Sequence, residues 1–487
     1  MSKKIITRFP PSPTGYLHVG SLRTALYNYL FSKKNKGKFY LRIEDTDQKR
    51  KIEGAEENLK KILKEFNINW DNKKVMIQSE RINIYKEYAE KLVASDNAYY
   101  CFCPKERLDD LRKNQQQKNL PPIYDRYCLN LSKNEIEKNK IQKKFVIRFK
   151  VKTNGITEIK DLVREKVNFD NKILDDPIII KSDGFPTYHL ASVIDDHEMG
   201  ITHIIRGEEW LPSVPKHIML YKAFGWNIPE FAHLPLLLNP DRSKLSKRQG
   251  DVAVEDYLKK GYLKETLLNF VLLLGWNPGN EKEIFSLNEM IKEFSLEKVH
   301  KSGAIFNVQK LDWLNSEYIK KLNPTEFKKL ATPFFKKNIA NIPIGINLEK
   351  IFPIEQERIS RLDEIGQKIK FFFEEISYEP KMLIWKKSNP KKTIDNLEML
   401  EKTIEKIKAG EWESKIIKEK ISYFILKNNL SNGDVLWPMR VALTGLEKSP
   451  PPFEVAEILG QKKSLERISN ASTSLKLYFK EIDKKFH

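Results

Sequence analysis

The first third of the chain alternates short apolar runs with segments of helical periodicity. Residues 4–9 (KIITRF) and 39–44 (FYLRIE) are rich in β-branched and aromatic residues, which predicts buried strands. Residues 52–66 place their apolar positions on one helical face. This alternation predicts an α/β fold with a doubly wound parallel sheet, whose site lies at the carboxyl ends of the strands. The apolar positions of the first predicted helix are Leu22, Leu26, Tyr29 and Leu30.

The pattern changes in residues 86–186. This segment contains a polar helical stretch at 105–118 and a β-rich stretch at 144–151. The strand and helix pattern of the first third then resumes in residues 187–240. We therefore expect an α+β insertion that splits one sheet domain, residues 1–85 and 187–240, into two halves.

The last third is helical and rich in lysine. Residues 241–324 predict a loop and a helical connection, and residues 325–487 predict an all-α region. Residues 449–452 (SPPP) predict a hinge before a final small helical unit. The apolar stripes of the two clearest helices are Leu397, Leu400, Ile404 and Ile407, and then Ile417, Ile421, Phe424 and Ile425.

Size, charge and cysteine content narrow the class of protein. The 487 residues are too many for one core, and the formal net charge of +20 favours a polyanionic partner. No apolar run has the length that a membrane span needs, and the basic start leads directly into a strand rather than a signal peptide. Three cysteines give no disulfide framework. We expect a cytoplasmic protein that contacts no membrane.

Residues 11–21 (PSPTGYLHVGS) predict a nucleotide cradle between the first strand and the first helix. Gly20 lets a phosphate or ribose approach the backbone, and Ser21 is a candidate helix N-cap. A helix N-terminus presents backbone N–H groups and a positive dipole end, both of which suit phosphate. His18 lies at the mouth of this turn and can donate a hydrogen bond to a phosphate oxygen. An ordinary βα turn with an incidental histidine is the alternative.

A second cationic segment lies far downstream, at residues 244–248 (KLSKR). Lys244, Lys247 and the nearby Arg242 are flanked by turn-forming residues, which predicts a mobile loop. Such a loop can close on a triphosphate and stabilise charge that develops in the reaction. A solvated basic loop is the alternative for this segment alone.

Together, these two segments resemble the ATP-binding signatures of class I aminoacyl-tRNA synthetases. With LRIEDTD, KSDGFPTYHLASVIDDH and IIRGEEW, the chain resembles the bacterial glutamyl-tRNA synthetases over most of its length, with a thin match in the last third. The resemblance implies a Rossmann-like class I sheet, an acceptor-binding insertion and an all-α anticodon-binding region. It implies that glutamate is activated with ATP and Mg²⁺ and then transferred to the 2′-hydroxyl of the terminal adenosine of tRNA-Glu. Members are expected to be monomers, and charging of tRNA-Gln as well stays open.

The same resemblance assigns roles to individual residues. Catalysis rests on His18 and Lys247, with Lys244 in support, because positioning and charge stabilisation suffice for both steps. The ATP site comprises Thr14, His18, Gly20, Glu209, Leu236, Leu237, Lys244 and Lys247. The glutamate site comprises Arg8, Ser12, Glu44, Tyr188, Ser192, Arg206 and Trp210.

The glutamate assignment agrees with the chemistry of that substrate. Arg8 and Arg206 would bind the two carboxylates, and Glu44 would meet the ammonium group. Each arginine alone could equally form a structural ion pair. Ser192 departs from the family pattern, in which asparagine is common, so its shorter hydroxyl would act through water.

Two further clusters carry candidate chemistry. Residues 195–197 (DDH) suggest a metal or catalytic cluster, although acidic residues there more often order a helix or loop. Cys101, Cys103 and Cys128 have a spacing similar to a zinc site in some family members, where a histidine follows the last cysteine. Asn130 occupies that histidine position and is a poor ligand for zinc. Zinc with a fourth donor from elsewhere and three free thiols both stay open.

Three other functions compete with this interpretation. A glutaminyl-tRNA synthetase would carry a β-barrel anticodon region and a different lysine-loop sequence. A small-molecule adenylating or nucleotidyl-transfer enzyme would have no use for the basic helical third. A non-catalytic RNA-binding protein would not need His18, Lys247 and Arg206 together.

Overall fold

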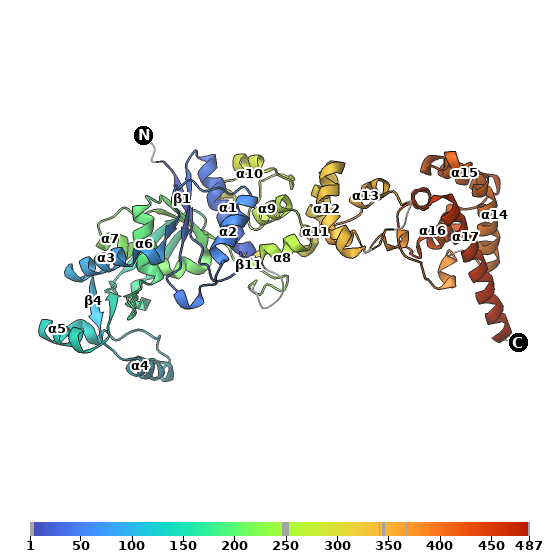
Figure 1. The fold of residues 1–487 in the computed structure, drawn as a ribbon. Helices are drawn as coiled ribbons and strands as arrows, with labels where there is room; N and C mark the ends of the chain where they lie inside the picture. The colour runs from blue at the N-terminus through green and yellow to red at the C-terminus, as the bar shows by residue number, and fades with distance from the viewer. Residues whose placement is uncertain are drawn as a thin grey trace. The chain divides into compact units, whose positions relative to one another are not determined.

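The computed structural model describes residues 4–245, 253–339, 341–342, 346–366, 368–386 and 388–485. The chain forms two compact units. The first comprises Met1–Leu258 and Leu263–Leu314, and the second comprises Lys259–Tyr262 and Asn315–His487. Figure 1 shows the strands gathered in the first unit and helices in the second.

Twelve strands are described. They are β1 (Ile6–Phe9), β2 (Lys38–Ile43), β3 (Met76–Ile77), β4 (Ala98–Cys101), β5 (Val146–Phe149), β6 (Ile156–Asp161), β7 (Glu165–Asp170), β8 (Ile178–Ile180), β9 (His203–Gly207), β10 (Glu230–Leu234), β11 (Leu237–Leu238) and β12 (Ala304–Ile305).

The helices in the first part of the chain lie between these strands or directly after them. They are α1 (Val19–Lys34), α2 (Ala55–Glu65), α3 (Ile82–Ala94), α4 (Lys105–Gln117), α5 (Lys133–Gln142), α6 (Tyr188–Glu198), α7 (Val214–Ala223), α8 (Val254–Lys259), α9 (Lys264–Leu273), α10 (Leu287–Glu293) and α11 (Val308–Lys321).

Parallel strands form the centre of the first unit. β1 pairs with β2 and β2 with β3, while β9 pairs with β10, all in parallel. The Thr202 N–H just before β9 donates to the Ile6 carbonyl oxygen at 3.0 Å, which brings β9 beside β1. The predicted parallel sheet is confirmed. The predicted apolar face of α1 is also buried, with Leu22, Leu26 and Leu30 sealed from solvent.

The expected insertion contributes to two sheets. β4, β5 and β8 form an antiparallel sheet, and α4 and α5 lie beside β4 at one end of the unit (Figure 1). The β6–β7 hairpin instead joins the sheet of β10 and β9, where Asp161 pairs with Phe231. Residues from the middle of the insertion therefore reach the main sheet.

The second unit is helical, as predicted. Its helices are α12 (Pro324–Asn338), α13 (Leu348–Gln356), α14 (Pro390–Glu405), α15 (Ser414–Lys427), α16 (Asn432–Thr444) and α17 (Pro452–Lys485). Both predicted apolar stripes, on α14 with the residues that follow it and on α15, are buried. α17 begins at Pro452, and the Trp412 indole N–H donates to the Ala456 carbonyl oxygen at 2.8 Å, so α17 packs within this unit. In the described part of the chain, no helix combines the length and apolarity that crossing a bilayer requires.

Candidate active site

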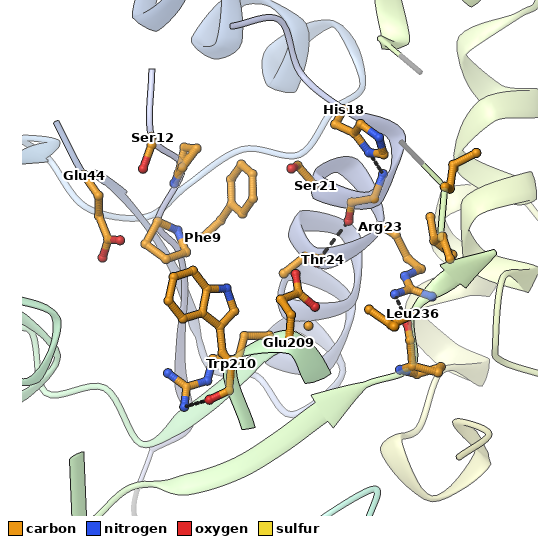
Figure 2. Close-up of a pocket in the computed structure, with 18 of the residues that line it drawn as sticks. Phe9, Ser12, His18, Ser21, Arg23, Thr24, Glu44, Glu209, Trp210 and Leu236 are labelled. Atoms are coloured by element: carbon orange, nitrogen blue, oxygen red, sulfur yellow. Dashed lines mark hydrogen bonds between the residues drawn. The ribbon is translucent and has the colours of Figure 1, made fainter. Parts of the chain in front are cut away.

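A cavity of about 430 Å³ opens at the carboxyl ends of β1, β2 and β9 and the start of α1. Figure 2 shows Glu44, Trp210 and Glu209 around it, with His18 beyond Ser21 at the start of the helix. Twelve residues of the predicted sites line it: Arg8, Ser12, His18, Gly20, Glu44, Tyr188, Arg206, Glu209, Trp210, Leu236, Leu237 and Lys244. Segments far apart in the sequence thus meet at one place, as the sheet topology requires.

His18 forms the N-cap of α1. Its backbone is extended, and its Nδ1 accepts a hydrogen bond from the Gly20 N–H at 2.9 Å. A neutral imidazole that accepts at Nδ1 carries its proton on Nε2, so the ring keeps one N–H donor. The predicted N-cap at Ser21 is wrong, because His18 supplies the capping acceptor and Ser21 lies within the first turn. A Cβ at Gly20 would lie 3.2 Å from His18 Nδ1 and would crowd this ring.

Arg206 is nearly buried, with 5 % of its surface exposed. Its Nη1 donates to the Tyr188 hydroxyl at 2.9 Å, and its Nη2 donates to the Trp210 carbonyl oxygen at 3.3 Å. Among the residues that the structure describes, none forms an ion pair with Arg206. The guanidinium group therefore brings a positive charge to the cavity that these neighbours do not neutralise.

Arg8 is held differently. Its Nε donates to Asp196 Oδ1 at 3.0 Å, and Arg42 Nη1 donates to the same oxygen at 2.6 Å. The Nη1 of Arg8 is buried and has no hydrogen-bond partner in the described structure. A buried guanidinium nitrogen without an acceptor is costly, which makes this atom a candidate donor to a bound anion.

The Asp195–Asp196–His197 cluster orders arginine side chains. Asp195 accepts hydrogen bonds from Gln78, Arg81 and Tyr85, while Asp196 holds Arg8 and Arg42. These contacts fit the structural alternative for the cluster. Among the described residues, the one group with metal-ligand spacing is the cysteine cluster.

Glu44 and two aromatic rings complete the side of the cavity near the arginines. Arg42 Nη2 donates to Glu44 Oε1 at 2.8 Å. Burial raises the pKa of Glu44, and the charge and hydrogen bonds of Arg42 offset part of that rise. The rings of Tyr188 and Trp210 lie 4.2 Å apart and form an apolar wall.

Glu209 and Lys244 lie on the side of the cavity near α1 and β11. The Glu209 carboxylate folds back over Gly207, and a Cβ at residue 207 would collide with it. The Leu236 N–H donates to Glu208 Oε1 at 2.8 Å, and the Leu236 carbonyl accepts from the Ala304 N–H at 2.9 Å. The Leu236 backbone is thus engaged within the protein, and its side chain is the part left to contact a ligand.

The cavity leaves out some predicted residues. Thr14 and Ser192 do not line it, and Ser192 is buried in α6. Lys247 lies outside the described residues. The sequence interpretation missed Arg23 and Thr24, which line the cavity three and four positions after Gly20 on α1. Residues at that spacing share a helix face, so the helical period could have identified both.

The predicted cysteine cluster forms in the insertion. The three sulfur atoms lie within 4.8 Å of one another, and Cys103 Sγ is 3.5 Å from Cys128 Sγ. The Tyr124 hydroxyl lies 3.4 Å from Cys101 Sγ and 3.3 Å from Cys103 Sγ. Asn130 is exposed at the end of the adjacent turn. Three soft donors therefore converge, and the nearby oxygen comes from Tyr124.

Comparisons with known proteins agree with this geometry. Residues 4–313 match the family described as tRNA synthetases class I (E and Q), catalytic domain, and residues 326–472 match the anticodon binding domain. The chain is 45 % identical to a glutamate–tRNA ligase of Clostridium botulinum (strain Okra / Type B1), covering 98 % of this chain and 99 % of that protein. It is 46 % identical to the glutamate–tRNA ligase of Clostridium tetani (strain Massachusetts / E88), covering 97 % and 98 %.

Solved structures show the same likeness. A glutamate tRNA ligase from Elizabethkingia meningosepticum CCUG26117, crystallised in complex with its amino acid, superimposes with a TM-score of 0.86 at 36 % identity. The match covers 97 % of this chain and 100 % of that one. Catalytic and anticodon-binding regions are both matched, and the curated relatives correspond along their whole length. The chain therefore belongs to the glutamate–tRNA ligase family of class I aminoacyl-tRNA synthetases.

Proposed function

We propose that this protein joins L-glutamate to tRNA-Glu in two steps. In the first step, an α-carboxylate oxygen of glutamate attacks the α-phosphorus of ATP, and the bond to pyrophosphate breaks. In the second step, the 2′-hydroxyl of the terminal adenosine attacks the carbonyl carbon of glutamyl-adenylate, loses its proton, and AMP leaves. The observation that carries the proposal is a pair of buried arginines in one cavity. Within the described residues, Arg206 forms no ion pair and the Nη1 of Arg8 has no hydrogen-bond partner.

This arrangement suits a dicarboxylate. Arg8 and Arg206 each offer guanidinium donors to one carboxylate, and such charge-assisted hydrogen bonds are among the strongest in proteins. Glu44 lies in the same cavity as the acceptor for the substrate ammonium group. Glutamine would present a neutral amide to one of the arginines, so the cavity favours glutamate by charge.

ATP binding falls to the residues around the start of α1. The Nε2–H of His18 and the backbone of Gly20 approach the phosphates, and the positive end of α1 adds to the attraction. Lys244 lines the cavity and Lys247 follows it in the same loop sequence. Mg²⁺, which arrives bound to ATP phosphates, neutralises part of their charge. Thr14 and Ser192 belong to the same proposal, although neither lines the cavity.

The helical unit binds tRNA in this proposal. The anticodon-binding family covers residues 326–472, and the strongly basic chain favours a polyanion. We assign the helical unit to the anticodon and the antiparallel sheet of the insertion to the acceptor end. Among the described residues no cysteine forms a disulfide, which fits a cytoplasmic enzyme. A monomer is the expected state in solution.

Zinc belongs to the same proposal as a structural metal of the insertion. Thiolates from Cys101, Cys103 and Cys128 would hold it, and zinc prefers four donors including sulfur. The Tyr124 hydroxyl lies 3.4 Å from Cys101 Sγ and 3.3 Å from Cys103 Sγ, but burial raises its pKa and keeps it a neutral phenol, which is a poor ligand for zinc. The fourth donor would therefore come from elsewhere. Bound zinc would fix the ends of β4 and the turn that contains Cys128.

Aminoacylation with radiolabelled glutamate tests the function, with purified tRNA-Glu and tRNA-Gln in parallel. Charging of tRNA-Glu alone would establish a discriminating enzyme, and charging of both would establish a non-discriminating one. Glutamine offered in place of glutamate is the matched control, because it has the same shape without the second charge. Charging with glutamine instead of glutamate, or charging of neither tRNA, would overturn the proposal.

A further inference from the structure

Two buried side chains, Asp161 and His233, form a hydrogen-bonded chain that ends on Arg206. Arg206 Nε donates to His233 Nε2 at 3.1 Å, and His233 Nδ1 lies 2.6 Å from Asp161 Oδ2. Asp161, His233 and Arg206 are 2 %, 0 % and 5 % exposed. Neither Asp161 nor His233 lines the cavity, so neither contacts the substrate directly.

Hydrogen-bond chemistry fixes the protons along this chain. A guanidinium Nε–H can only donate, so His233 Nε2 must accept and carry no proton. The proton of the neutral imidazole therefore lies on Nδ1 and is donated to Asp161. Burial lowers the pKa of His233, which keeps the ring neutral despite the adjacent carboxylate. Burial alone would raise the pKa of Asp161, but hydrogen bonds from His233 and from backbone N–H groups outweigh it and leave the carboxyl ionised.

The sheet brings these three residues together. Arg206 on β9 pairs with His233 on β10, and Phe231 on β10 pairs with Asp161 at the end of β6. Asp161 Oδ1 also accepts from the backbone N–H groups of Val163 and Arg164 at 2.9 and 2.8 Å. The backbone that follows Asp161 thus fixes the carboxylate independently of its contact with the imidazole of His233.

We propose that Asp161 and His233 are positioning residues that orient Arg206 toward a substrate carboxylate without neutralising its charge. A carboxylate placed directly on Arg206 would form an ion pair and compete with the substrate. The imidazole of His233 lies between Asp161 and Arg206. It fixes the orientation of the guanidinium group and keeps the carboxylate from contacting that group directly. This inference rests on the proposed function in one respect, namely that Arg206 binds glutamate.

Asp161→Asn gives the sharpest test. The side-chain oxygen of the introduced asparagine can keep the backbone hydrogen bonds, while its NH₂ group faces His233 Nδ1 and requires that nitrogen to accept. The imidazole proton then moves to Nε2, where it opposes the Nε–H of Arg206. We expect the KM for glutamate to rise on the order of tenfold to a hundredfold, with the KM for ATP changed less than about twofold. The double variant Asp161→Asn with Arg206→Ala should have the same KM for glutamate as Arg206→Ala alone.

Two substitutions at His233 separate positioning from packing. In His233→Gln, the side-chain oxygen can still accept from Arg206, and we expect most of the glutamate affinity to be kept. His233→Leu fills the space without an acceptor, and we expect a loss similar to that of Asp161→Asn. Equal KM values for the wild type, Asp161→Asn and His233→Leu would overturn the inference. A parallel rise in the KM for glutamate and the KM for ATP, together with a lower melting temperature, would also overturn the inference. Such a result would indicate a purely structural role for Asp161 and His233.

Nitrogen-15 NMR of the intact protein labelled at histidine reads the tautomer directly. The His233 signal, identified by its loss in His233→Gln, should show a proton on Nδ1 in the wild type and on Nε2 in Asp161→Asn. A wild-type proton on Nε2 would overturn the inference whatever the kinetics. A wild type that charges no tRNA would overturn the proposed function, and the NMR result would still decide how Arg206 is held.

Discussion

Asp196 accepts a hydrogen bond from Arg8 Nε at 3.0 Å, with both side chains sealed from solvent at 2 % and 1 % exposure. The same carboxylate oxygen accepts from Arg42 at 2.6 Å. Asp196 thus holds both Arg8, which lines the cavity, and Arg42, which donates to Glu44. Burial opposes the ionisation of Asp196, but the two arginines outweigh it and lower the pKa of this carboxyl.

Asp196→Ala should therefore destabilise the protein strongly. Removing one partner of a buried ion pair leaves the other charge uncompensated and costs about 3–5 kcal/mol. We expect a large fall in the urea midpoint of the intact chain, followed by circular dichroism. The control is Glu80→Gln, which breaks an exposed pair with Lys74 and should cost less than about 1 kcal/mol. Similar midpoints for the two variants would contradict the role of Asp196.

His18 caps α1, and in the proposed function it also donates to the ATP phosphates. Substitutions can separate these two roles. In His18→Asn, the side-chain oxygen can still accept from the Gly20 N–H and cap α1, but the Nε2–H is lost. We expect stability close to wild type with adenylate formation slowed on the order of a hundredfold, because a donor to developing charge is missing. The measurement is pyrophosphate exchange in the presence of tRNA-Glu.

His18→Ala is the matched variant because it removes the cap as well as the donor. It should lose about 1 kcal/mol of stability. Its rate of adenylate formation should fall by the same factor as in His18→Asn. Full activity in His18→Asn would mean that His18 acts in this site through the helix cap alone.

The cysteine cluster makes a prediction about metal content. We expect about one zinc per chain by mass spectrometry of the purified protein, lost in Cys103→Ser because one of three thiolate ligands is removed. In the wild-type protein, three thiols should react with a disulfide reagent after the metal is chelated. Protein without metal and with all three thiols reactive from the start would favour the alternative of free cysteines. Asn130→Ser, at an exposed position, is the control and should leave the metal in place.

The local pattern predicted a nucleotide cradle at residues 11–21 and a site at the carboxyl ends of the strands, while the family resemblance implied the individual site residues. Arg8 and Arg206 end segments of clear strand composition, and parallel strands bring their carboxyl ends to one edge. The link from Asp161 through His233 could not be predicted in this way. It depends on the register of β6 against β10, two strands far apart in the chain, and a single sequence carries little information about such pairing.

The N-cap of α1 shows a second limit of prediction from local sequence. Serine is the statistically preferred capping residue, so local propensity predicts Ser21. The backbone turns three residues earlier and makes His18 the cap. The residue to which we assign a role at the ATP phosphates therefore occupies a position that propensity assigns to serine or aspartate.

The helical unit contains a titratable group with a separate consequence for stability. Glu355 on α13 is fully buried, and neither carboxylate oxygen has a hydrogen-bond partner in the described structure. Burial raises the pKa of this carboxyl from 4.5 to about 7, although the charges of Arg358 and Lys368 oppose the rise. Folded protein therefore holds a proton at pH 6 that the unfolded chain releases.

Stability should consequently fall as the pH rises from about 4.5 to about 7, and this contribution should be constant outside that window. With about 1.4 kcal/mol for each pKa unit, the loss is on the order of 3 kcal/mol. Glu355→Gln cannot ionise, so it should flatten this dependence and be the more stable form at pH 8. Urea unfolding at pH 5, 6, 7 and 8 measures the effect, with Glu349→Gln at an exposed position of α13 as control. The assignment would be wrong if Glu355→Gln and the control lost stability equally over this range.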